Sequence, residues 1–484
     1  MSRPAERVNT PFALRNYVAD EWRIPDSTLP HAVCDANTGE PLFRQARSSP
    51  EQVEGAIRSA LAAHREGAWT RMGGERRAGL LAVVADALEA VVEDMAVFDA
   101  LLTGVPIART RSIARVCPAS FRAAAQLALE DTTIRREDSF IVERLPLGPS
   151  AIAGPWNAPS GIACHKLASA LAAGCPVVFK PSEWAPVSGQ IIAGAVAGSG
   201  LPPGVFQLLH GTGETFAAIV KDERIAAVSL TGGLRAGRSV AGTCARQMKP
   251  AQLELGGNNP LLVLPGADMA AAADGVVAAL TTLNGQWCRA LGRLIVHESL
   301  ADELIAATMK RLSALRVGLS TDSATEFGPL GHRARKDAVE AAIRDYRALG
   351  GTVHRSTPLP KLGGWFVAPA LVTGTHTDSA LEEVFGPVAT VHTFADIDEC
   401  VALANRAPYG LAAYVFGETN EAVCVARRIE AGTVKVNAVT LFSPHPSAPR
   451  PAWKLSGIGD EGTRETFEFF RGTRVVGVPR GTGA

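Results

Sequence analysis

The chain has 484 residues, with 48 Lys and Arg against 48 Asp and Glu, so its formal net charge is zero. Such a length exceeds what one hydrophobic core usually serves and predicts roughly two to four domains. A balanced charge provides no overall field for nucleic acid or for an anionic membrane surface, so neither partner is expected. No run of about 18 apolar residues occurs, which argues against a membrane span, and we expect no secretory signal.

Eight cysteines are spread widely along the chain. None forms a C-x-x-C pair, so no zinc site or other metal site is expected. A long chain without clustered cysteines is typical of a cytoplasmic protein with reduced thiols. Any single cysteine is most simply a small buried side chain, and a reactive role for one of them needs further support.

Helical patterns dominate residues 50–128. Ser49 followed by Pro50 is a favourable helix start, because serine caps the helix and proline suits its first turn. The tract from Ile134 then alternates polar and apolar residues, which predicts an extended strand. Residues 443–454 contain four prolines and are predicted to form a loop, since proline breaks helices and central strands.

Short apolar runs alternate with helical tracts over residues 150–255, and a second such series covers 260–440. This alternation predicts right-handed crossovers and parallel sheets, and hence two α/β lobes. Ligands bind at the carboxyl ends of strands in such sheets. Polar or glycine-rich groups fall at these ends, each of them a weak signal alone: residues 155–157, 180–183, 231–233 and 254–257. L-T-G-G before a helix can offer free backbone N–H groups to a phosphate.

Taken in order, these groups and later segments resemble the aldehyde dehydrogenase superfamily. The resemblance runs from about residue 37 to the C-terminus and rests on eight ordered motifs: G-P-W-N at 154–157, F-K-P-S-E at 179–183, L-T-G-G at 230–233, L-E-L-G-G at 253–257, N-G-Q-W-C at 284–288, E-E-V-F-G-P-V at 382–388, Y-G-L-A-A-Y-V-F at 409–416 and G-T-V-K-V-N at 432–437. It implies an α/β fold of two Rossmann-like domains plus a small β oligomerisation element. The implied division is 1–127 with 145–254 for NAD binding, 255–455 for catalysis, and 128–144 with 456–484 for oligomerisation.

The catalytic residues implied by the resemblance each have a chemical rationale. Cys288 matches the nucleophile, whose thiolate adds to an aldehyde carbon. Asn157 and the backbone N–H of Cys288 match the donors to the resulting oxyanion. Glu254 matches the general base that activates water to hydrolyse a thioester, and Lys180 matches a position shared by catalysis and cofactor binding. Taken alone, Asn157 also fits a turn residue and Glu254 a surface acid in an ion pair.

The resemblance also implies a nicotinamide cofactor. Lys180 and Glu183 match positions that face the adenosine ribose, where a carboxylate accepts hydroxyl protons and repels a 2′-phosphate. NAD is therefore expected, with NADP as the alternative. Glu383 and Phe385 match residues at the nicotinamide ribose and ring. The remaining implied cofactor residues are Trp156, Gly213, Thr231, Gly232, Gly233 and Leu255.

Departures from the family pattern bear on the substrate. Ala158 replaces a common aromatic residue and is expected to widen the substrate tunnel, and His165 stands where a tryptophan is common. Arg450 replaces another tunnel aromatic, and Arg289 follows the nucleophile. Arginine offers a planar fork suited to carboxylate, so Arg450 and Arg289 are predicted to read a polar or anionic group on the substrate. The alternatives are a solvated loop charge for Arg450 and an inward, paired side chain for Arg289.

A cation beside Cys288 is also expected to favour the thiolate and to speed its alkylation at neutral pH. Two rival functions stay open: a CoA-acylating dehydrogenase, against which Glu254 argues because hydrolysis needs that base, and a catalytically silent structural or binding relative. By analogy, the partners are a small aldehyde and further copies of the chain in a homodimer or homotetramer.

Overall fold

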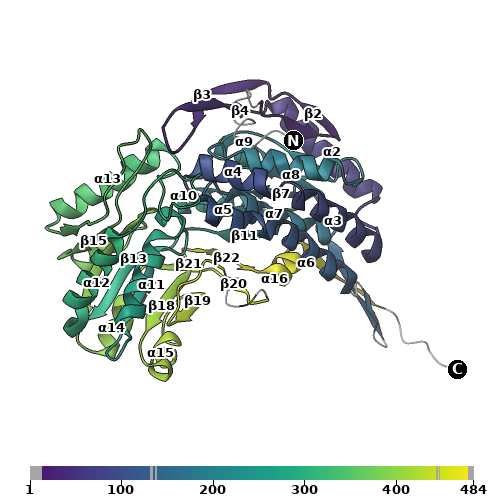
Figure 1. The fold of residues 1–484 in the computed structure, drawn as a ribbon. Helices are drawn as coiled ribbons and strands as arrows, with labels where there is room; N and C mark the ends of the chain where they lie inside the picture. The colour runs from purple at the N-terminus through teal and green to yellow at the C-terminus, as the bar shows by residue number, and fades with distance from the viewer. Residues whose placement is uncertain (1–12, 131–133, 137–138, 443–444, 446, 478–484) are drawn as a thin grey trace.

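A computed structural model describes residues 13–130, 134–136, 139–442, 445 and 447–477. Two large sheets lie in separate lobes, and a smaller antiparallel sheet projects from the first lobe (Figure 1). The predicted α/β fold with two parallel sheets is confirmed. Because the two lobes meet along one edge, segments distant in sequence come together there.

The helical prediction for residues 50–128 is confirmed, and the first helix begins as expected. Ser49 Oγ accepts a hydrogen bond from Gln52 N at 3.2 Å, and Gln52 Oε1 accepts one from Ser49 N at 3.2 Å, so the two close a capping box. The helices of this region are α2 (Pro50–Glu66), α3 (Gly74–Glu89), α4 (Val92–Thr103), α5 (Ile107–Ala114) and α6 (Val116–Glu130).

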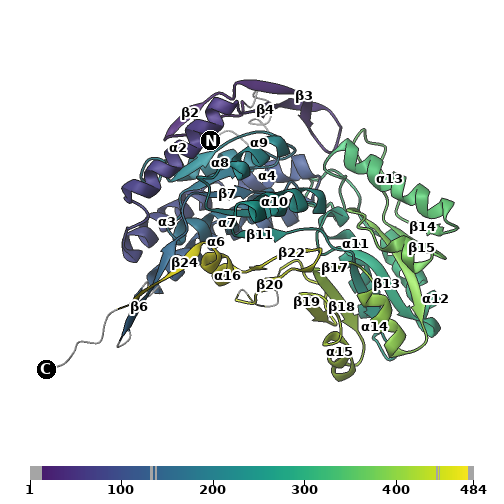
Figure 2. The same cartoon turned by 180° about the vertical axis from the view of Figure 1, so that it is seen from behind.

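The first large sheet carries the helices α7 (Pro159–Ala172), α8 (Val187–Ala197), α9 (Gly213–Lys221) and α10 (Leu234–Arg246) (Figure 2). Its strand order is β2 (Glu21–Arg23), β1 (Asn16–Val18), β9 (Phe206–Leu208), β8 (Val177–Lys180), β7 (Ser150–Ala153), β10 (Ala227–Thr231), β11 (Ala251–Glu254) and β22 (Gly457–Ile458). The five strands from β9 to β11 run parallel. The chain order reverses between β7 and β10, which is the position where open α/β sheets bind ligands.

The second sheet has the order β14 (Thr352–His354), β15 (Ala370–Thr373), β16 (Val388–Phe394), β13 (Leu291–His297), β12 (Asn259–Val263), β18 (Ala412–Phe416) and β19 (Thr433–Val436). Its helices are α11 (Met269–Thr281), α12 (Ala301–Ser313), α13 (Arg333–Ala348), α14 (Ile397–Asn405) and α15 (Thr419–Ala426). The sequence patterns did not reveal β14 and β15. β14 has three residues and β15 has four, and they pair antiparallel with each other.

The small sheet pairs β6 (Phe140–Pro146) with β5 (Ile134–Arg136) and with β24 (Arg471–Gly477), and it extends as an arm in both ribbon views (Figures 1 and 2). The extended prediction for the tract from Ile134 is confirmed in its described part; residues 137–138 lie outside the described residues. The sequence assigned all of 456–484 to this element. Residues 457–470 instead lie with the first lobe, because β22 pairs with β11 and α16 (Thr463–Phe469) buries Phe467 against α6 and α7.

The proline-rich segment 443–454 was predicted to be a loop, and residues 443–444 and 446 lie outside the described residues. Its later part contains two short strands, so that prediction is only partly right. β20 (Arg450–Pro451) pairs with β23 (Asp460–Glu461), and β21 (Trp453–Lys454) pairs with β17 (Tyr409–Gly410). Proline is tolerated in such edge strands.

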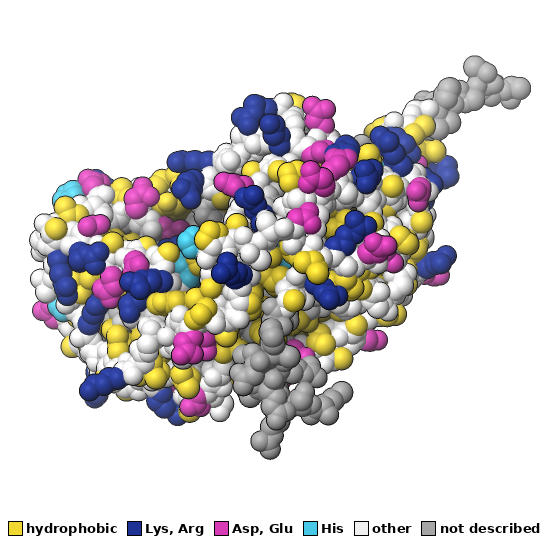
Figure 3. Space-filling view, turned by 90° about the horizontal axis from the view of Figure 1, so that it is seen from above, with side chains coloured by type: hydrophobic (Ala, Val, Ile, Leu, Met, Phe, Trp, Pro, Cys, Tyr) yellow, Lys and Arg dark blue, Asp and Glu magenta, His cyan; other side chains and the backbone are white. Residues whose placement is uncertain are grey.

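Basic and acidic side chains are interspersed on the face shown in Figure 3. In the part of the chain that the structure describes, no helix combines the length and apolarity needed to cross a bilayer.

Candidate active site

The predicted site residues come from both lobes. Asn157, Lys180 and Glu254 lie at or just beyond the carboxyl ends of β7, β8 and β11, as the strand-end argument predicts. Cys288 and Glu383 come instead before β13 and β16, at the amino ends of the second sheet's strands. The site therefore forms where the carboxyl edge of one sheet faces the amino edge of the other.

The loop that presents Cys288 has a strained start and is held by side-chain amides. Leu283 and Asn284 adopt the left-handed region, with φ values of 52° and 58°, which asparagine tolerates better than most residues. Asn284 Nδ2 donates to Gly104 O and Pro329 O, each at 2.8 Å. Gln286 Nε2 donates to Thr103 O at 3.1 Å. Both amides are fully buried, and their bonds fix the approach to the nucleophile.

The other side of Cys288 is held by residues that the sequence did not single out. Asn259, at the start of β12, donates from Nδ2 to Cys288 O at 2.9 Å and to Ala290 O at 2.7 Å. Tyr414 Oη donates to Arg289 O at 2.8 Å. In the sequence, the hint of a role for Asn259 is its position two residues after the L-E-L-G-G motif. Hydrogen bonds on both sides leave the Cys288 backbone little freedom.

Cys288 is partly exposed, and the carboxyl group of Glu254 lies near enough to its thiol to affect its pKa. Burial of the thiol raises its pKa well above the usual value, and the nearby negative charge of Glu254 raises it further. Arg289 lowers this pKa but does not outweigh them. Arg289 therefore acts in the predicted direction, favouring the thiolate, but burial and Glu254 act more strongly in the other direction.

Arg289 points inward. Its side chain is 9% exposed, and Nη1 donates to Leu411 O at 3.4 Å. Its charge lowers the pKa of Glu254 as well as that of Cys288. This placement favours the alternative in which the Arg289 side chain points into the protein. Its charge lies close to Cys288 and Glu254 and favours the ionised form of each.

Asn157 is buried, and its Nδ2 donates to Gln286 O at 2.8 Å. That contact places the amide two residues before the nucleophile. Glu254 is also buried, and burial raises its pKa. Glu461 raises that pKa further, and Lys166 opposes it. The predicted trio of Cys288, Asn157 and Glu254 is thus brought together.

On the cofactor side, Lys180 is buried and holds the loop that follows β8. Its Nζ donates to Pro181 O at 2.8 Å, to Gly211 O at 3.2 Å and to Glu183 Oε2 at 3.4 Å. Lys180 and Glu183 therefore lie together, with the carboxyl group of Glu183 oriented by the ammonium.

Glu383 Oε1 accepts a hydrogen bond from Gly257 N at 2.9 Å, and burial raises the pKa of Glu383 to about 7. Phe385 and Trp156 meet edge to face, with ring centroids 5.7 Å apart. Two residues that the sequence did not single out complete this group. Arg335 lies over the Phe385 ring at 5.5 Å, and His332 lies 5.0 Å from the Trp156 ring. The group spans both lobes.

The turn after β10 tests whether a dinucleotide phosphate fits. Thr231 Oγ1 is buried and has no hydrogen-bond partner among the described residues, and Gly233, the N-cap residue of α10, has no side chain with which to cap the helix. Both features suit an anion at a helix N-terminus. Gly232 N is not free, however, because it donates to Glu254 O at 3.0 Å. The side chain of Leu255 packs against α10 at Gly237.

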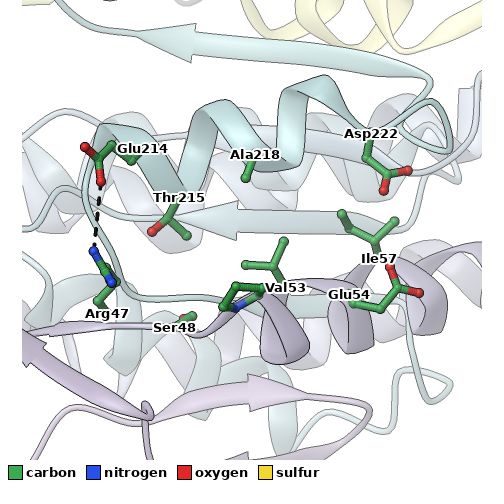
Figure 4. A pocket seen from close by; sticks show the side chains of 10 residues that line it. Arg47, Ser48, Val53, Glu54, Ile57, Glu214, Thr215, Ala218 and Asp222 are labelled. Carbon is green, nitrogen blue, oxygen red and sulfur yellow. Dashed lines mark ion pairs between the residues drawn. The ribbon is translucent and has the colours of Figure 1, made fainter.

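Gly213 is the first residue of α9, after the capping Thr212. A hollow of about 330 Å³ lies on one side of α9, facing α2 (Figure 4). Arg47 and Glu214 mark one end, 3.9 Å apart. No predicted site residue lines this hollow.

Among the described residues, no cluster of three or more His, Cys, Asp or Glu side chains is placed to hold a metal ion.

Two of the predicted substrate residues, Ala158 and Arg450, lie beside α7. Ala158, the residue before α7, is buried in an apolar cluster with Trp287 and the partly buried Ile162, Val439 and Leu441. Arg450 Nη2 contacts His165 Nε2 at 2.8 Å and lies 4.0 Å from Glu461. Its side chain remains 35% exposed. A cation therefore stands one helical turn along α7 from Ile162.

The sequence profile of the Aldehyde dehydrogenase family matches residues 22–476. The chain belongs to the aldehyde dehydrogenase family. It is 34% identical over 477 residues to betaine aldehyde dehydrogenase from Cereibacter sphaeroides, covering 97% of each protein. It is 33% identical over 455 residues to the non-phosphorylating aspartate-semialdehyde dehydrogenase of Halomonas elongata, covering 92% of each.

Solved structures agree with this aldehyde dehydrogenase fold. A Pseudomonas syringae aldehyde dehydrogenase C mutant, in complex with NAD+ and octanal, matches with a TM-score of 0.92, 32% identity and 98% coverage of both chains. Betaine aldehyde dehydrogenase from Staphylococcus aureus, in complex with NAD+, matches with a TM-score of 0.94 and 27% identity, covering 100% of this chain and 98% of the other.

Proposed function

We propose that this aldehyde dehydrogenase oxidises an aldehyde bearing an anionic or polar group to the carboxylate, with NAD+ as hydride acceptor. The observation that carries the proposal is the gathering of three groups: Glu254 is near enough to raise the pKa of the Cys288 thiol, and the Asn157 amide is bonded to the Cys288 loop at Gln286 O, 2.8 Å away. A nucleophile, a base and an oxyanion donor within one buried site are what acyl chemistry on an aldehyde requires.

The addition step follows from the raised pKa of Cys288, which favours the thiol form. Glu254 takes the thiol proton as Sγ adds to the carbonyl carbon, and the C–O electron pair moves onto oxygen. An asparagine amide has two hydrogens. One from Asn157 is held by Gln286 O, so the other donates to the oxyanion together with Cys288 N–H. Losing one such donor costs about 3 kcal/mol of barrier.

When bound, NAD+ supplies the oxidation by accepting the hydride that leaves the thiohemiacetal carbon. The product on Cys288 is a thioester. Glu254, after its proton has passed to solvent, accepts a proton from water as the water oxygen attacks the thioester carbon. The C–S bond then breaks, Glu254 returns the proton to the Cys288 thiolate, and the acid leaves as the carboxylate after losing its own proton to solvent.

Cofactor placement is supported by the groups on both lobes. Glu183, oriented by Lys180, is placed to accept hydrogen bonds from ribose hydroxyls and to repel a 2′-phosphate. Glu383 and Phe385 are placed for the second ribose and the ring, and the unpartnered Thr231 hydroxyl for the pyrophosphate. We expect kcat/KM with NAD+ to exceed that with NADP+; equal values would remove Glu183 from this role.

Substrate charge is argued from Arg450. Its guanidinium is held by His165 and stays partly exposed, beyond the apolar cluster around Ala158. The names of two relatives specify aldehydes with different charged groups: betaine aldehyde carries a quaternary ammonium group and no carboxylate, whereas aspartate semialdehyde carries a carboxylate together with an ammonium group. A fixed arginine attracts a carboxylate and repels a quaternary ammonium group, so an anionic semialdehyde is the better substrate.

The test is a kinetic comparison of a semialdehyde, an uncharged aldehyde of equal length and betaine aldehyde, scored by NADH formation. We expect the semialdehyde to have the highest kcat/KM and Arg450→Ala to remove its advantage. Arg464→Ala is the matched control, because Arg464 is an exposed arginine that pairs with Glu130. Equal kcat/KM values in the wild type, unmoved by Arg450→Ala, would reject the charge argument.

The two rival functions are separated by the same assay. CoA in the mixture would yield a thioester product if the enzyme were CoA-acylating, whereas Glu254 favours the free acid. A broad aldehyde panel without any NADH burst would favour a silent relative.

Homo-oligomers are part of the proposal, supported by the projecting sheet of β5, β6 and β24 with its exposed Val475.

A further inference from the structure

Helix α7, which follows the oxyanion residue Asn157, begins without a cap of its own. Ala158 occupies the N-cap position and has no side-chain oxygen to offer, and Pro159 has no N–H group. The carboxyl group of Asp99 from α4 lies at this helix start, where the N–H of Ser160 lowers the pKa of Asp99. Ser160 Oγ also donates to Asp99 Oδ2, at 2.5 Å. Asp99 thus supplies, from another helix, the capping oxygen that α7 lacks.

The same carboxyl group holds a second helix start. Ser188, in the first turn of α8, donates its hydroxyl to Asp99 Oδ1. Helix α8 also lacks a side-chain cap, since Pro186 occupies its N-cap position. It follows directly on the 180–183 segment that carries Lys180 and Glu183. One acid therefore fixes where both the oxyanion segment and the cofactor segment enter their helices.

The end of α4 beyond Asp99 reaches the nucleophile loop. Thr103 Oγ1 donates to Asp99 O at 2.6 Å, and Thr103 O accepts from Gln286 Nε2 at 3.1 Å. Gly104 O accepts from Asn284 Nδ2 at 2.8 Å. The turn from Asp99 to Gly104 is thus bonded to all three segments that carry chemistry.

Burying the carboxyl group of Asp99 costs free energy, so an acid is an unfavourable choice for a purely structural role at this position. It is 3% exposed, and burial raises its pKa to about 6, although the hydroxyls of Ser160 and Ser188 and the N–H of Ser160 all lower it. An apolar residue would fill the space without burying a charge. The positive end of the α7 dipole favours the carboxylate at this place.

We propose that Asp99 is a positioning residue of this enzyme, which holds Asn157 through Ser160 and the Lys180–Glu183 segment through Ser188 in register with the Cys288 loop. The proposal rests on the proposed function for its kinetic consequences. Asp99 itself does not touch the reacting atoms. Asp99 bonds to Ser160 at the start of α7 and to Ser188 at the start of α8. Because these serines follow different segments of the site, removing each bond should have a separate effect.

The experiment compares Ser160→Ala, Ser188→Ala and Asp99→Ala in the full-length enzyme. Ser160→Ala should lower kcat several-fold with little change in the KM for NAD+. Ser188→Ala should raise the KM for NAD+ several-fold with little change in kcat, and Asp99→Ala should do both. Asp99→Asn should recover part of the loss, because an amide oxygen still caps Ser160. The matched control is Ser169→Ala, a buried serine of α7 whose hydroxyl bonds only within its helix, to His165 O.

A readout without turnover accompanies the kinetics. Deuterium exchange at the first turn of α7 should be faster in Asp99→Ala and Ser160→Ala than in Ser169→Ala. If exchange responds but the wild type oxidises no aldehyde, the proposed function fails and the cap stands. Equal exchange in all variants, or equal losses of kcat and of NAD+ affinity from both serine variants and the control, would overturn the proposal.

Discussion

Glu383 offers a measurable conflict between stability and cofactor binding. Burial raises its pKa from the ordinary 4.5 to about 7, while Gly257 N–H and Arg335 lower it and Glu254 raises it. For an acid whose folded pKa is raised, the protonated form's contribution to stability is complete below about 4.5 and is lost as pH rises through about 7. The difference between the two pKa values, 4.5 and about 7, corresponds to about 3 kcal/mol of unfolding free energy, at about 1.4 kcal/mol per pKa unit.

Glu383→Gln removes the ionisable group but keeps an oxygen for Gly257 N–H. Above about pH 8 the variant should therefore be more stable than the wild type by up to about 3 kcal/mol, and at about pH 5 by much less. With an unfolding entropy of about 1 kcal/mol/K for a chain of this length, the gain is about 3 °C in Tm. The same variant should bind NAD+ more weakly, which marks the acid as retained for function.

Thermal unfolding of both proteins at the two pH values measures this difference. Glu418→Gln is the opposite-sign control, because backbone N–H groups of Glu421 and Asn420 hold the pKa of Glu418 below its usual value. That variant should lose stability at high pH relative to low pH. A Tm difference for Glu383→Gln that is the same at both pH values would refute the reasoning.

Two further predictions concern the nucleophile loop. Iodoacetamide should label Cys288 more slowly than a free cysteine at neutral pH and faster in Glu254→Gln, because Glu254 raises the pKa of the thiol; equal rates in wild type and variant would contradict this. Asn284→Ala removes the donors to Gly104 O and Pro329 O and one acceptor. At about 1 kcal/mol for each bond it should lose about 3 kcal/mol, seen as a lower Tm, and an unchanged Tm would show that the loop is held by other contacts.

Asn157 and Arg289 show what the sequence could predict and what it could not. The amphipathic periods and the capping signal at Ser49 are local properties of the chain, so they located the helices and most strands of both lobes. Asn157, Cys288 and Glu254 were identifiable from ordered motifs. The direction of the Arg289 side chain was open, because Leu411, which accepts its hydrogen bond, lies over a hundred residues away.

The sequence by itself thus determined most of the elements and the α/β architecture with two parallel sheets, since these depend on short-range patterns. It implied Cys288, Glu254 and Asn157 as the reacting residues only through the resemblance to the aldehyde dehydrogenase superfamily. Only the tertiary structure showed that the pKa of Cys288 is raised, because desolvation by surrounding atoms outweighs the neighbouring cation. It also decided how Asn259 and Asp99 act, since each bonds to segments that are distant in the chain. A charge's solvation and a hydrogen bond between distant residues exist only after the chain has packed.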